Sequence, residues 1–373
     1  MMRQIVSFVR RETVFCASAV LALASMAVIP PDREYLAYPD YRSLSLLFCL
    51  MIIVAGFRSL GVFELLGRSL LRRAGGTRSL SVVLVLLCFF SSMLITNDVT
   101  LLTFVPFTLL VFRMIGQEER VLRLVVLETI AANLGSMATP IGNPQNLYLF
   151  SISGLSAGAF LRAVVPYAAM ALVMLLGALL LQRSAAIDHE DLPAPTAADR
   201  PPLSAMAPFL ALLVLCLLVV FRVLPYAPVL VIVAAAVLAV DRRLFRSVDY
   251  FLLLTFLCFF IFIGNLKRVP AVNDFLVYLV RGHELLAGIA ASQIISNVPA
   301  AILLAGFTAD FAPLLTGVNL GGLGTLIASL ASLISFKFFA GEYPGRKGTF
   351  FWVFTLWNVA FLAVLTAAAL FLS

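Results

Sequence analysis

Four short polar segments interrupt otherwise apolar stretches of the sequence, and they contain the residues that could do chemistry. They are Thr96-Asn97-Asp98, the run from Thr139 to Asn146 (TPIGNPQN), Ser296-Asn297-Val298-Pro299, and Gly321 to Thr325, which is followed by Ser329 and Ser332. The second segment holds two prolines and a glycine, a combination that breaks a helix. A break frees backbone carbonyls that can bind a cation and exposes N–H groups that suit an anion. The pattern therefore predicts a site for ions or small charged solutes.

Hydroxyl and amide side chains in these segments would supply neutral ligands. The residues that we expect to contact substrate or ion are Thr96, Asn97, Asp98, Thr139, Gly142, Asn143, Asn146, Ser296, Asn297, Thr325, Ser329 and Ser332. Hard cations such as sodium favour oxygen ligands, so sodium is expected near Asn97 and Asn143 and again near Asn297 and Thr325. The alternative is that Ser, Thr, Gly and Asn only mediate close packing and hydrogen bonds between helices. That alternative is weakest for GNPQN, which would pack poorly.

Two carboxylates lie inside apolar segments, Asp98 at the first polar segment and Glu128 in LVVLETIAANL. A charged acid at the centre of a bilayer costs at least about 2.5–3.5 kcal/mol, so each is a functional candidate. Asp98 could bind a cation or carry a proton, and we expect it to couple transport to an ion gradient. Glu128 is the second coupling candidate. Because it follows Arg120 by about two helical turns, a structural ion pair is an equal alternative for it.

The elements that position these residues must lie in a membrane. Of the 373 residues, 62% are hydrophobic and 12% are charged, and the mean hydropathy is +1.06. Ordinary soluble domains contain roughly 25% charged residues. The apolar segments run unbroken instead of alternating, which excludes an outer-membrane barrel and predicts an all-α polytopic membrane protein. The net charge of +7 comes from Lys and Arg scattered in short loops, so it indicates membrane topology and not nucleic-acid binding.

The sequence lacks the residues that several classes of enzyme and pump require. The sequence has no HExxH and no GxxxxGK[ST], and His189 and His283 both lie outside the apolar segments. The five cysteines lie in apolar stretches without CxxC spacing, so neither a zinc site nor a disulfide framework is expected. We therefore expect a protein that is not an enzyme and has no cofactor. A channel is harder to exclude than an enzyme.

The two halves of the chain resemble each other. Asn97 matches Asn297, and residues 133–147 align without gaps on residues 319–333. The alignment pairs Asn133 with Asn319, Gly135 with Gly321, Thr139 with Thr325, Ile141 with Ile327, Asn143 with Ser329, and Asn146 with Ser332. Duplicated halves are typical of secondary transporters. We expect a first helix and external loop in residues 1–42, repeat 1 in 43–182, a cytoplasmic linker and connecting helix in 183–225, and repeat 2 in 226–373.

The charge distribution predicts the topology. Residues 285–308 are too short to cross the bilayer twice, and a single crossing would place the last basic cluster outside, against the positive-inside rule. We therefore expect them to form a re-entrant hairpin. By likeness residues 79–115 form another, although two full crossings fit the charges there equally well. The result is about nine transmembrane helices plus two hairpins in inverted repeats, with the N-terminus cytoplasmic and the C-terminus external. The first apolar run resembles a signal peptide, but a retained helix is favoured by its length.

The segment ANLGSMATPIGNPQNL (132–147) is similar to the Thr-Pro-x-Gly-x-Pro-x-Asn break of the ion-transporter superfamily with a citrate-transporter-like domain. This group includes arsenite permeases, sodium/proton antiporters, and di- and tricarboxylate carriers, and the resemblance covers residues from about 43 to 373. In the dicarboxylate carriers both hairpin tips read Ser-Asn-Thr and bind sodium and carboxylates. The resemblance implies the same roles for residues 96–98 and 296–298. Asp98 and Val298 depart from that pattern, and the Asn-Asp tip is more similar to the arsenite-permease branch.

These observations predict a secondary active transporter in the bacterial inner membrane. It would move a small anion or metalloid oxyanion by alternating access, coupled to sodium or protons. The alternatives are a sodium/proton antiporter without an organic substrate and an anion channel. The expected partners are the small anionic solute and the lipid bilayer, with no nucleic acid, and the resemblance implies a homodimer.

Overall fold

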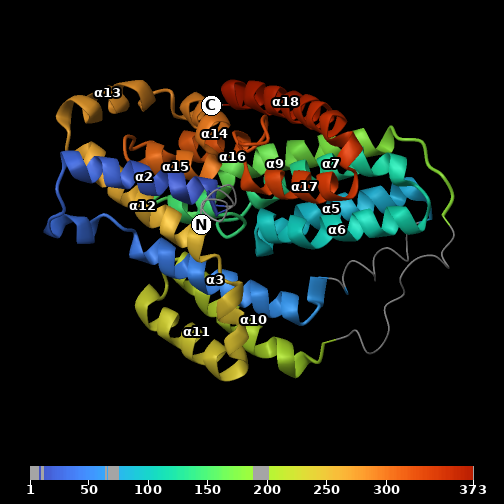
Figure 1. Cartoon of the computed structure of the whole chain (residues 1–373), viewed down its shortest axis with the longest axis horizontal. Coiled ribbons are helices and arrows are strands. Elements are labelled where there is room, and N and C mark those ends of the chain that lie inside the picture. Colours follow the sequence, from blue (N-terminus) through green and yellow to red (C-terminus); the bar gives the residue numbers. More distant parts are fainter. Residues whose placement is uncertain (1–7, 10–11, 64, 66–74, 188–200, 373) are drawn as a thin grey trace.

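A computed structural model describes residues 8–9, 12–63, 65, 75–187 and 201–372, and the described residues form helices and loops without a strand. The helices are α2 (Thr13–Val28), α3 (Tyr41–Ser59), α5 (Thr77–Ile95), α6 (Asn97–Met114), α7 (Val121–Ser136), α8 (Pro144–Ser153), α9 (Ala157–Leu180), α10 (Leu203–Val220), α11 (Tyr226–Asp241), α12 (Tyr250–Lys267), α13 (Pro270–Val280), α14 (Glu284–Ile295), α15 (Asn297–Ala305), α16 (Phe311–Leu320), α17 (Leu330–Glu342) and α18 (Lys347–Leu372) (Figure 1). Short 3-10 helices are η1 (Arg33–Ala37), η2 (Glu118–Arg120), η5 (Arg242–Ser247) and η6 (Pro344–Arg346). The expected all-α class is confirmed.

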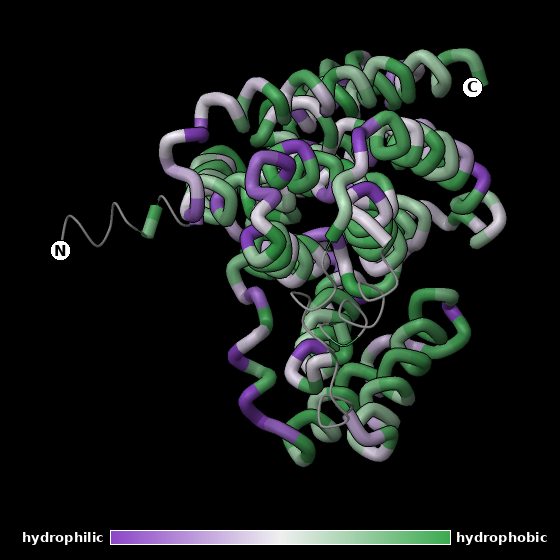
Figure 2. Tube along the Cα trace, turned by 90° about the vertical axis from the view of Figure 1, so that its right-hand side faces the viewer, coloured by the Kyte–Doolittle hydropathy of each residue, from purple (hydrophilic) through white to green (hydrophobic). Residues whose placement is uncertain are grey.

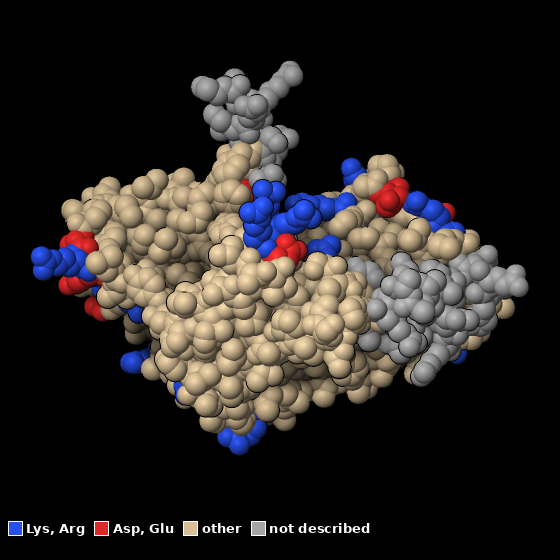
Figure 3. Space-filling model, turned by 90° about the horizontal axis from the view of Figure 1, so that it is seen from below, with Lys and Arg blue, Asp and Glu red and all other residues tan. Residues whose placement is uncertain are grey.

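The helices are apolar enough for a membrane. Within the described residues, seven are long and apolar enough to cross a bilayer singly, namely α3, α5, α6, α9, α10, α12 and the segment that ends with α18. Hydrophobic colouring dominates the helices, and hydrophilic residues gather in the loops between them (Figure 2). A broad face of the molecule carries almost no charged side chains (Figure 3). Both features match a protein whose surface is solvated by lipid.

Two helical hairpins turn back at the tips that the sequence predicts. The first joins α5 to α6 at Thr96, and the second joins α14 to α15 at Ser296. Both turning residues adopt left-handed backbone angles, with φ of 68° at Thr96 and 73° at Ser296. Positive φ angles strain the backbone of residues other than glycine. Because the same strain occurs at equivalent positions, the two tips share one local structure. The arms differ in length, with 19 and 18 residues in the first hairpin and 12 and 9 in the second.

Two other segments are broken in the middle. Between α7 and α8 the chain leaves the helix, and Asn143 starts α8 by accepting a hydrogen bond at 2.9 Å from the Asn146 N–H. Pro144 follows at the first helical position, where its missing N–H costs nothing. Between α16 and α17 the break contains no proline. Gly324 permits it instead with φ of 104°, a conformation that side chains strongly disfavour.

The hairpins and broken helices interlock. The first arm of each hairpin packs against the first half of the broken helix that follows it, α5 against α7 and α14 against α16. The second arm packs against the same broken helix, α6 against α7 and α15 against α16, and also against the other half of the chain, α6 against α17 and α15 against α8. Each break therefore meets two hairpins. These contacts between the two halves hold the tips and breaks in position.

The remaining helices frame this unit. Helix α2 packs along α12, and α3 packs against α10 and α11, which form the lower layer in Figure 1. Helices α9 and α18 flank α7 and α16 on the other side. At one end of the molecule, Arg268 binds Asp32 at 2.7 Å, and this hydrogen bond lowers the pKa of the Asp32 carboxyl. Residues 188–200 of the expected linker lie outside the described residues. The domain boundaries stay predictions.

Candidate functional site

Each hairpin tip is bonded to a break through the backbone. The Asn97 N–H donates to the Gly142 carbonyl at 3.2 Å, and the Asn297 N–H donates to the Ala328 carbonyl at 2.9 Å. The alignment of the two halves pairs Gly142 with Ala328, so the two contacts are equivalent. Gly142 fits closely, because an added Cβ would lie 2.1 Å from the Ser136 carbonyl oxygen. The tips and breaks that the sequence singles out are therefore in direct contact.

A buried network of amides and hydroxyls crosses between the halves. Asn133 accepts a hydrogen bond from Ser329 at 3.0 Å and donates to Ser332 at 3.4 Å. The equivalent Asn319 accepts from Asn143 at 3.1 Å and donates to Asn146 at 2.6 Å, and all six side chains are almost fully buried. Each of the two aligned asparagines thus bonds to residues of the other half of the chain, and these partners are themselves aligned with each other. Buried polar groups of this kind are stabilising only while they remain paired.

The threonines of the two breaks also occupy equivalent positions. The Thr139 hydroxyl donates to the Met93 carbonyl at 2.5 Å, and the Thr325 hydroxyl lies 3.5 Å from the Gln293 carbonyl. Both carbonyls belong to the residue three before a hairpin tip. Gln293 adds contacts that Met93 cannot make, because its amide donates to the carbonyls of Gly321 and Leu323. Gln293 therefore holds the second break, which has no proline of its own.

The two tip asparagines differ in their side-chain partners. The Asn97 amide donates to Asn133 at 2.9 Å, and its oxygen accepts from the Asp98 N–H at 3.0 Å. The Asn297 side chain makes no hydrogen bond within the described part of the chain, although only 4% of the residue is exposed. Its amide nitrogen faces the backbone at Gly322. Asn297 therefore retains a buried donor and acceptor for a further partner.

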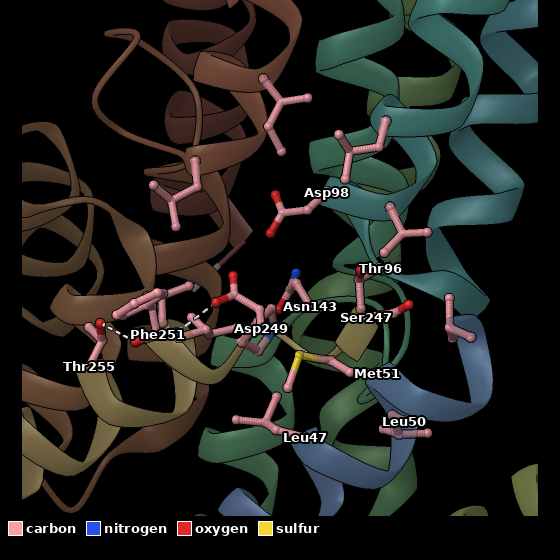
Figure 4. A pocket seen from close by; sticks show the side chains of 18 of the residues that line it. Leu47, Leu50, Met51, Thr96, Asp98, Asn143, Ser247, Asp249, Phe251 and Thr255 are labelled. Carbon is pink, nitrogen blue, oxygen red and sulfur yellow. Dashed lines mark hydrogen bonds between the residues drawn. The ribbon is translucent and has the colours of Figure 1, made fainter. Parts of the chain in front are cut away.

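A cavity of about 910 Å³ reaches the first tip from one end of the molecule. Figure 4 shows Asp98 pointing into it, with Thr96 and Asn143 nearby. Its walls come from both halves of the chain and include α3, α12, the start of α15 at Val298, and α17. The Asp98 carboxylate has no hydrogen-bond or ionic partner among the described residues. The Asp98 carboxylate is thus available to bind a ligand in the cavity.

Further charged groups surround the approach to Asp98. Asp249, at the start of α12, lines the same cavity and is bound to the Leu252 N–H at 2.9 Å. Arg58 and Lys337 line it from α3 and α17. With Glu12, which also lines the cavity, the lining contains three acids and two bases, in contrast to a uniformly positive pocket for polyanions.

The predicted site residues fall into distinct environments. Thr96, Asp98 and Asn143 line the cavity. The residues that do not line it are Asn97, Thr139, Gly142, Asn146, Ser296, Asn297, Thr325, Ser329 and Ser332. Most of the second group bind each other or the backbone, and Asn143 also uses its side chain in the buried network. Asn146, Ser329 and Ser332 thus form hydrogen bonds between helices in this conformation, as the packing alternative predicts.

Glu128 lies away from the cavity in the middle of α7. It is fully buried, and one carboxyl oxygen accepts a hydrogen bond from Thr108 at 2.5 Å. The other oxygen has no partner among the described residues. The ion pair considered for Glu128 is not formed, because Arg120 binds Gln117 and the Arg183 carbonyl instead.

Sequence reasoning left several site residues out. Asn133 and Asn319 were paired by the alignment but were not assigned to the site, although they are the centres of the network. Gln293 lies one helical turn before the second tip, and that spacing could have identified it. Asp249 carries no such signal, because it lies in a charged loop far from the polar segments along the chain.

The fold and the cavity define a class of protein. Interlocked hairpins and broken helices around a deep cavity, in a chain of apolar helices, are the architecture of a polytopic membrane transporter. A family model described as "Citrate transporter" matches residues 2–333, and the chain belongs to this family, a member of the ion-transporter superfamily.

Two of three similar proteins are named as transporters, and the third is named as an inner membrane protein. The chain is 30% identical to an uncharacterized transporter of Methanocaldococcus jannaschii, over 95% of this chain and 96% of the relative. It is 34% identical to the inner membrane protein YbiR of Escherichia coli, over 88% and 87% of the two chains. A silicon efflux transporter of Oryza sativa is 35% identical over 155 residues, which cover 40% of this chain and 31% of the relative. These similarities indicate transport and not catalysis.

Proposed function

We propose that this protein is a secondary active transporter that moves a small anion or metalloid oxyanion across the inner membrane by alternating access. The observation that carries the proposal is the unpaired Asp98 carboxylate at the inner end of a cavity lined by both halves of the chain. A solute bound there would touch a hairpin tip and a break together. Movement of either half would then change the solute's access to water.

We propose that Asp98 couples transport to sodium or protons. The carboxylate and the Thr96 hydroxyl are oxygen ligands of the kind that sodium prefers, and the carboxylate can equally carry a proton. Neither side chain is used by other described residues. Asn97, Asn143 and Asn297 would support the ion and substrate sites, with Thr325, Ser329 and Ser332 at the second break. Glu128 is the reserve candidate for proton coupling.

The topology proposed from the charges gives the cavity a direction. Arg58 and Lys337 belong to the positions that the positive-inside rule assigns to the cytoplasm. With the N-terminus inside and the C-terminus outside, the cavity opens to the cytoplasm, and the conformation is inward-facing. Val298 and Pro299 of the second tip line this cavity, whereas Asn297 does not. We also propose, from the family likeness alone, that the protein works as a homodimer.

The substrate class follows from the charges of the cavity. A carrier for citrate-like polyanions would need an excess of positive charge, and the carboxylates of Asp98 and Asp249 oppose it. A small oxyanion or a weak oxyacid with hydroxyl groups fits the mixed lining better. The similarity to a silicon efflux transporter supports this choice, because that relative is named for export of silicon.

The proposal is tested by flux measurements in proteoliposomes loaded with arsenite, silicate or citrate. Asp98→Asn keeps the side-chain shape, and we expect it to abolish the dependence of flux on a sodium or proton gradient. Asp274→Asn, at an acid of α13 outside the cavity, is the matched control and should leave that dependence intact. Gradient-dependent flux that survives in Asp98→Asn would show that coupling resides elsewhere. Ionic current that persists without any gradient coupling, at rates beyond a carrier's cycle, would favour a channel.

A further inference from the structure

A second cavity lies at the opposite side of α7 from the tips, and arginines dominate its lining. It has a volume of about 570 Å³ and is formed where α7 and α18 begin and α9 ends. The charged residues in its lining are Glu119, Arg120, Arg123, Arg183 and Arg346. Four guanidinium groups, from η2, α7, η6 and the loop after α9, thus line the cavity together with one carboxylate. The excess of positive charge indicates an anionic partner.

Two of the four arginines have no side-chain partner of any kind among the described residues. The Arg123 and Arg183 side chains make no ion pair or hydrogen bond with any described residue. Arg120 donates to the Arg183 carbonyl at 2.7 Å, which fixes one wall of the cavity. Arg346 lies over the rings of Phe339 and Tyr343, at 6.0 and 5.9 Å from their centroids. The cavity therefore combines two oriented guanidinium groups with two unpaired ones.

A neutral donor in the same lining points to the same kind of ligand. The Gln182 side-chain nitrogen is buried and has no acceptor among the described residues. A buried donor without an acceptor costs about 1–3 kcal/mol, so a ligand oxygen at this place would be stabilising. Phosphate oxygens accept from amide and guanidinium donors together. This donor is independent of the charge count, and it favours the same phosphate-like ligand.

The surroundings of the cavity place it at the level of lipid headgroups. Leu181 lines the cavity and is 88% exposed, and Trp352, next to the lining residue Val353, is 72% exposed. Tryptophan is enriched at the boundary between the apolar core and the headgroups. Apolar side chains of α9 and α18 are exposed next to the arginines, where acyl chains would lie.

We propose that this cavity binds the phosphate of an anionic phospholipid headgroup in the cytoplasmic leaflet. The guanidinium groups and Gln182 would hold the phosphate, and the acyl chains would lie against Leu181 and α18. A bound lipid would tie the start of α7 to α9 and α18, and so fix the broken helix against its frame. Two other anions could fill the site, namely free phosphate and the chain's own acidic segment at Asp188, Glu190 and Asp191, and the experiment separates them.

The test is a thermal-stability titration of the purified full chain in a neutral detergent. Short-chain phosphatidylglycerol should raise the melting temperature in a saturable way, and short-chain phosphatidylcholine and inorganic phosphate should not. Arg123→Gln with Arg183→Gln should raise the half-saturating concentration of phosphatidylglycerol by about tenfold or more, since each removes a charge-assisted contact. Arg243→Gln, at an exposed arginine of η5 outside the cavity, is the matched control and should not change it.

Three results would overturn the proposal. An equal stabilisation by inorganic phosphate alone would assign the cavity to a free anion. Unchanged phosphatidylglycerol binding in the double variant would place the lipid elsewhere. Stabilisation by phosphatidylglycerol that is absent in the unaltered chain and appears only after Asp188→Asn, Glu190→Gln and Asp191→Asn are combined would assign the cavity to the linker. Should the double variant not fold, Arg183→Gln alone carries the same comparison, and native mass spectrometry of co-purified lipid gives a second readout.

Discussion

The two hairpin tips have the same backbone and different side-chain roles. Both tip residues turn through a left-handed conformation, and both following asparagines donate an N–H to the equivalent carbonyl of a break. At the first tip the Asn97 side chain is held by Asn133, and the neighbouring Asp98 is free to meet a ligand. At the second tip the amide of Asn297 itself is unpaired, and Val298 replaces the acid. The two tips thus share their backbone geometry and differ in the groups that they offer to a ligand.

The two breaks differ in a similar way. The first is closed by Pro144 and the Asn143 cap, and its Ile141 is buried. The second is held by Gln293, and its Thr325 and Ile327 are exposed. The first break is therefore braced from within, and the second is braced by a side chain of the neighbouring hairpin. A change at Gln293 should loosen the second break without disturbing the first.

The largest effect is expected at the centres of the crossing network. Asn133→Leu removes the partner of Asn97, Ser329 and Ser332, so buried donors and acceptors are left unpaired at about 1–3 kcal/mol each. We expect the variant to lose folded protein in detergent, as measured by size-exclusion chromatography and thermal unfolding. Thr129→Val, which removes a single hydroxyl bonded to Ser335, is the control and should fold. Wild-type stability in Asn133→Leu would show that the network does not stabilise the fold.

The next effect separates the two tips. Asn297→Ala should reduce substrate flux in proteoliposomes by about tenfold or more while changing the melting temperature little, because its side chain has no hydrogen bond to lose. Asn97→Ala should lower stability by about 1–3 kcal/mol, because Asn133 then loses a buried donor. Equal losses of stability in both variants would contradict the difference between the tips. Unaltered flux in both would eliminate this binding site.

A smaller effect distinguishes the two break threonines. Thr139→Val should lower the free energy of unfolding by about 1 kcal/mol, because its hydroxyl is bonded at 2.5 Å in a partly buried place. Thr325→Val should change it much less, since its hydroxyl lies 3.5 Å from the carbonyl and the residue is exposed. Thermal unfolding of the matched pair gives the comparison. A greater loss in Thr325→Val would mean that the second break depends on this hydroxyl.

The smallest effect on stability is expected from two exposed ion pairs near the ends of the hairpins. Arg268 binds Asp32 near the second hairpin, and Arg113 binds Glu342 near the first. Because the pKa of Asp32 is lowered in the folded state, its contribution to stability is present above the usual aspartate pKa of about 3.9 and is lost as the pH falls through the lowered value. Melting temperatures measured from pH 7 to pH 3 should show a slightly smaller acid loss in Asp32→Asn. Identical profiles would indicate no net contribution from this exposed pair.

The sequence predicts much of the architecture because membrane helices obey strong constraints. Unpaired backbone is not tolerated in lipid, so Pro140, Pro144 and the glycines had to mark breaks, and the repeated Asn97 and Asn297 had to mark turns. The contacts between Gly142, Ala328 and the tips follow from the same alignment. The partners of individual side chains were not predictable. Whether the Asn143 side chain faces a cavity or Asn319 depends on how two helices far apart in the sequence pack together. No local sequence pattern determines that packing.

The fastening of each tip to its break restricts how the molecule can move. A cycle that swung one hairpin by itself would have to sever the bond from Asn97 to Gly142 or from Asn297 to Ala328, and would strip buried polar groups of their partners. A displacement that carries both hairpins and both broken helices together severs none of them. The sliding boundary then lies where α8 meets α3 and α15 meets α12. Spin labels on two members of the inner block should stay at constant separation throughout transport, while a label on α3 should see that block pass by.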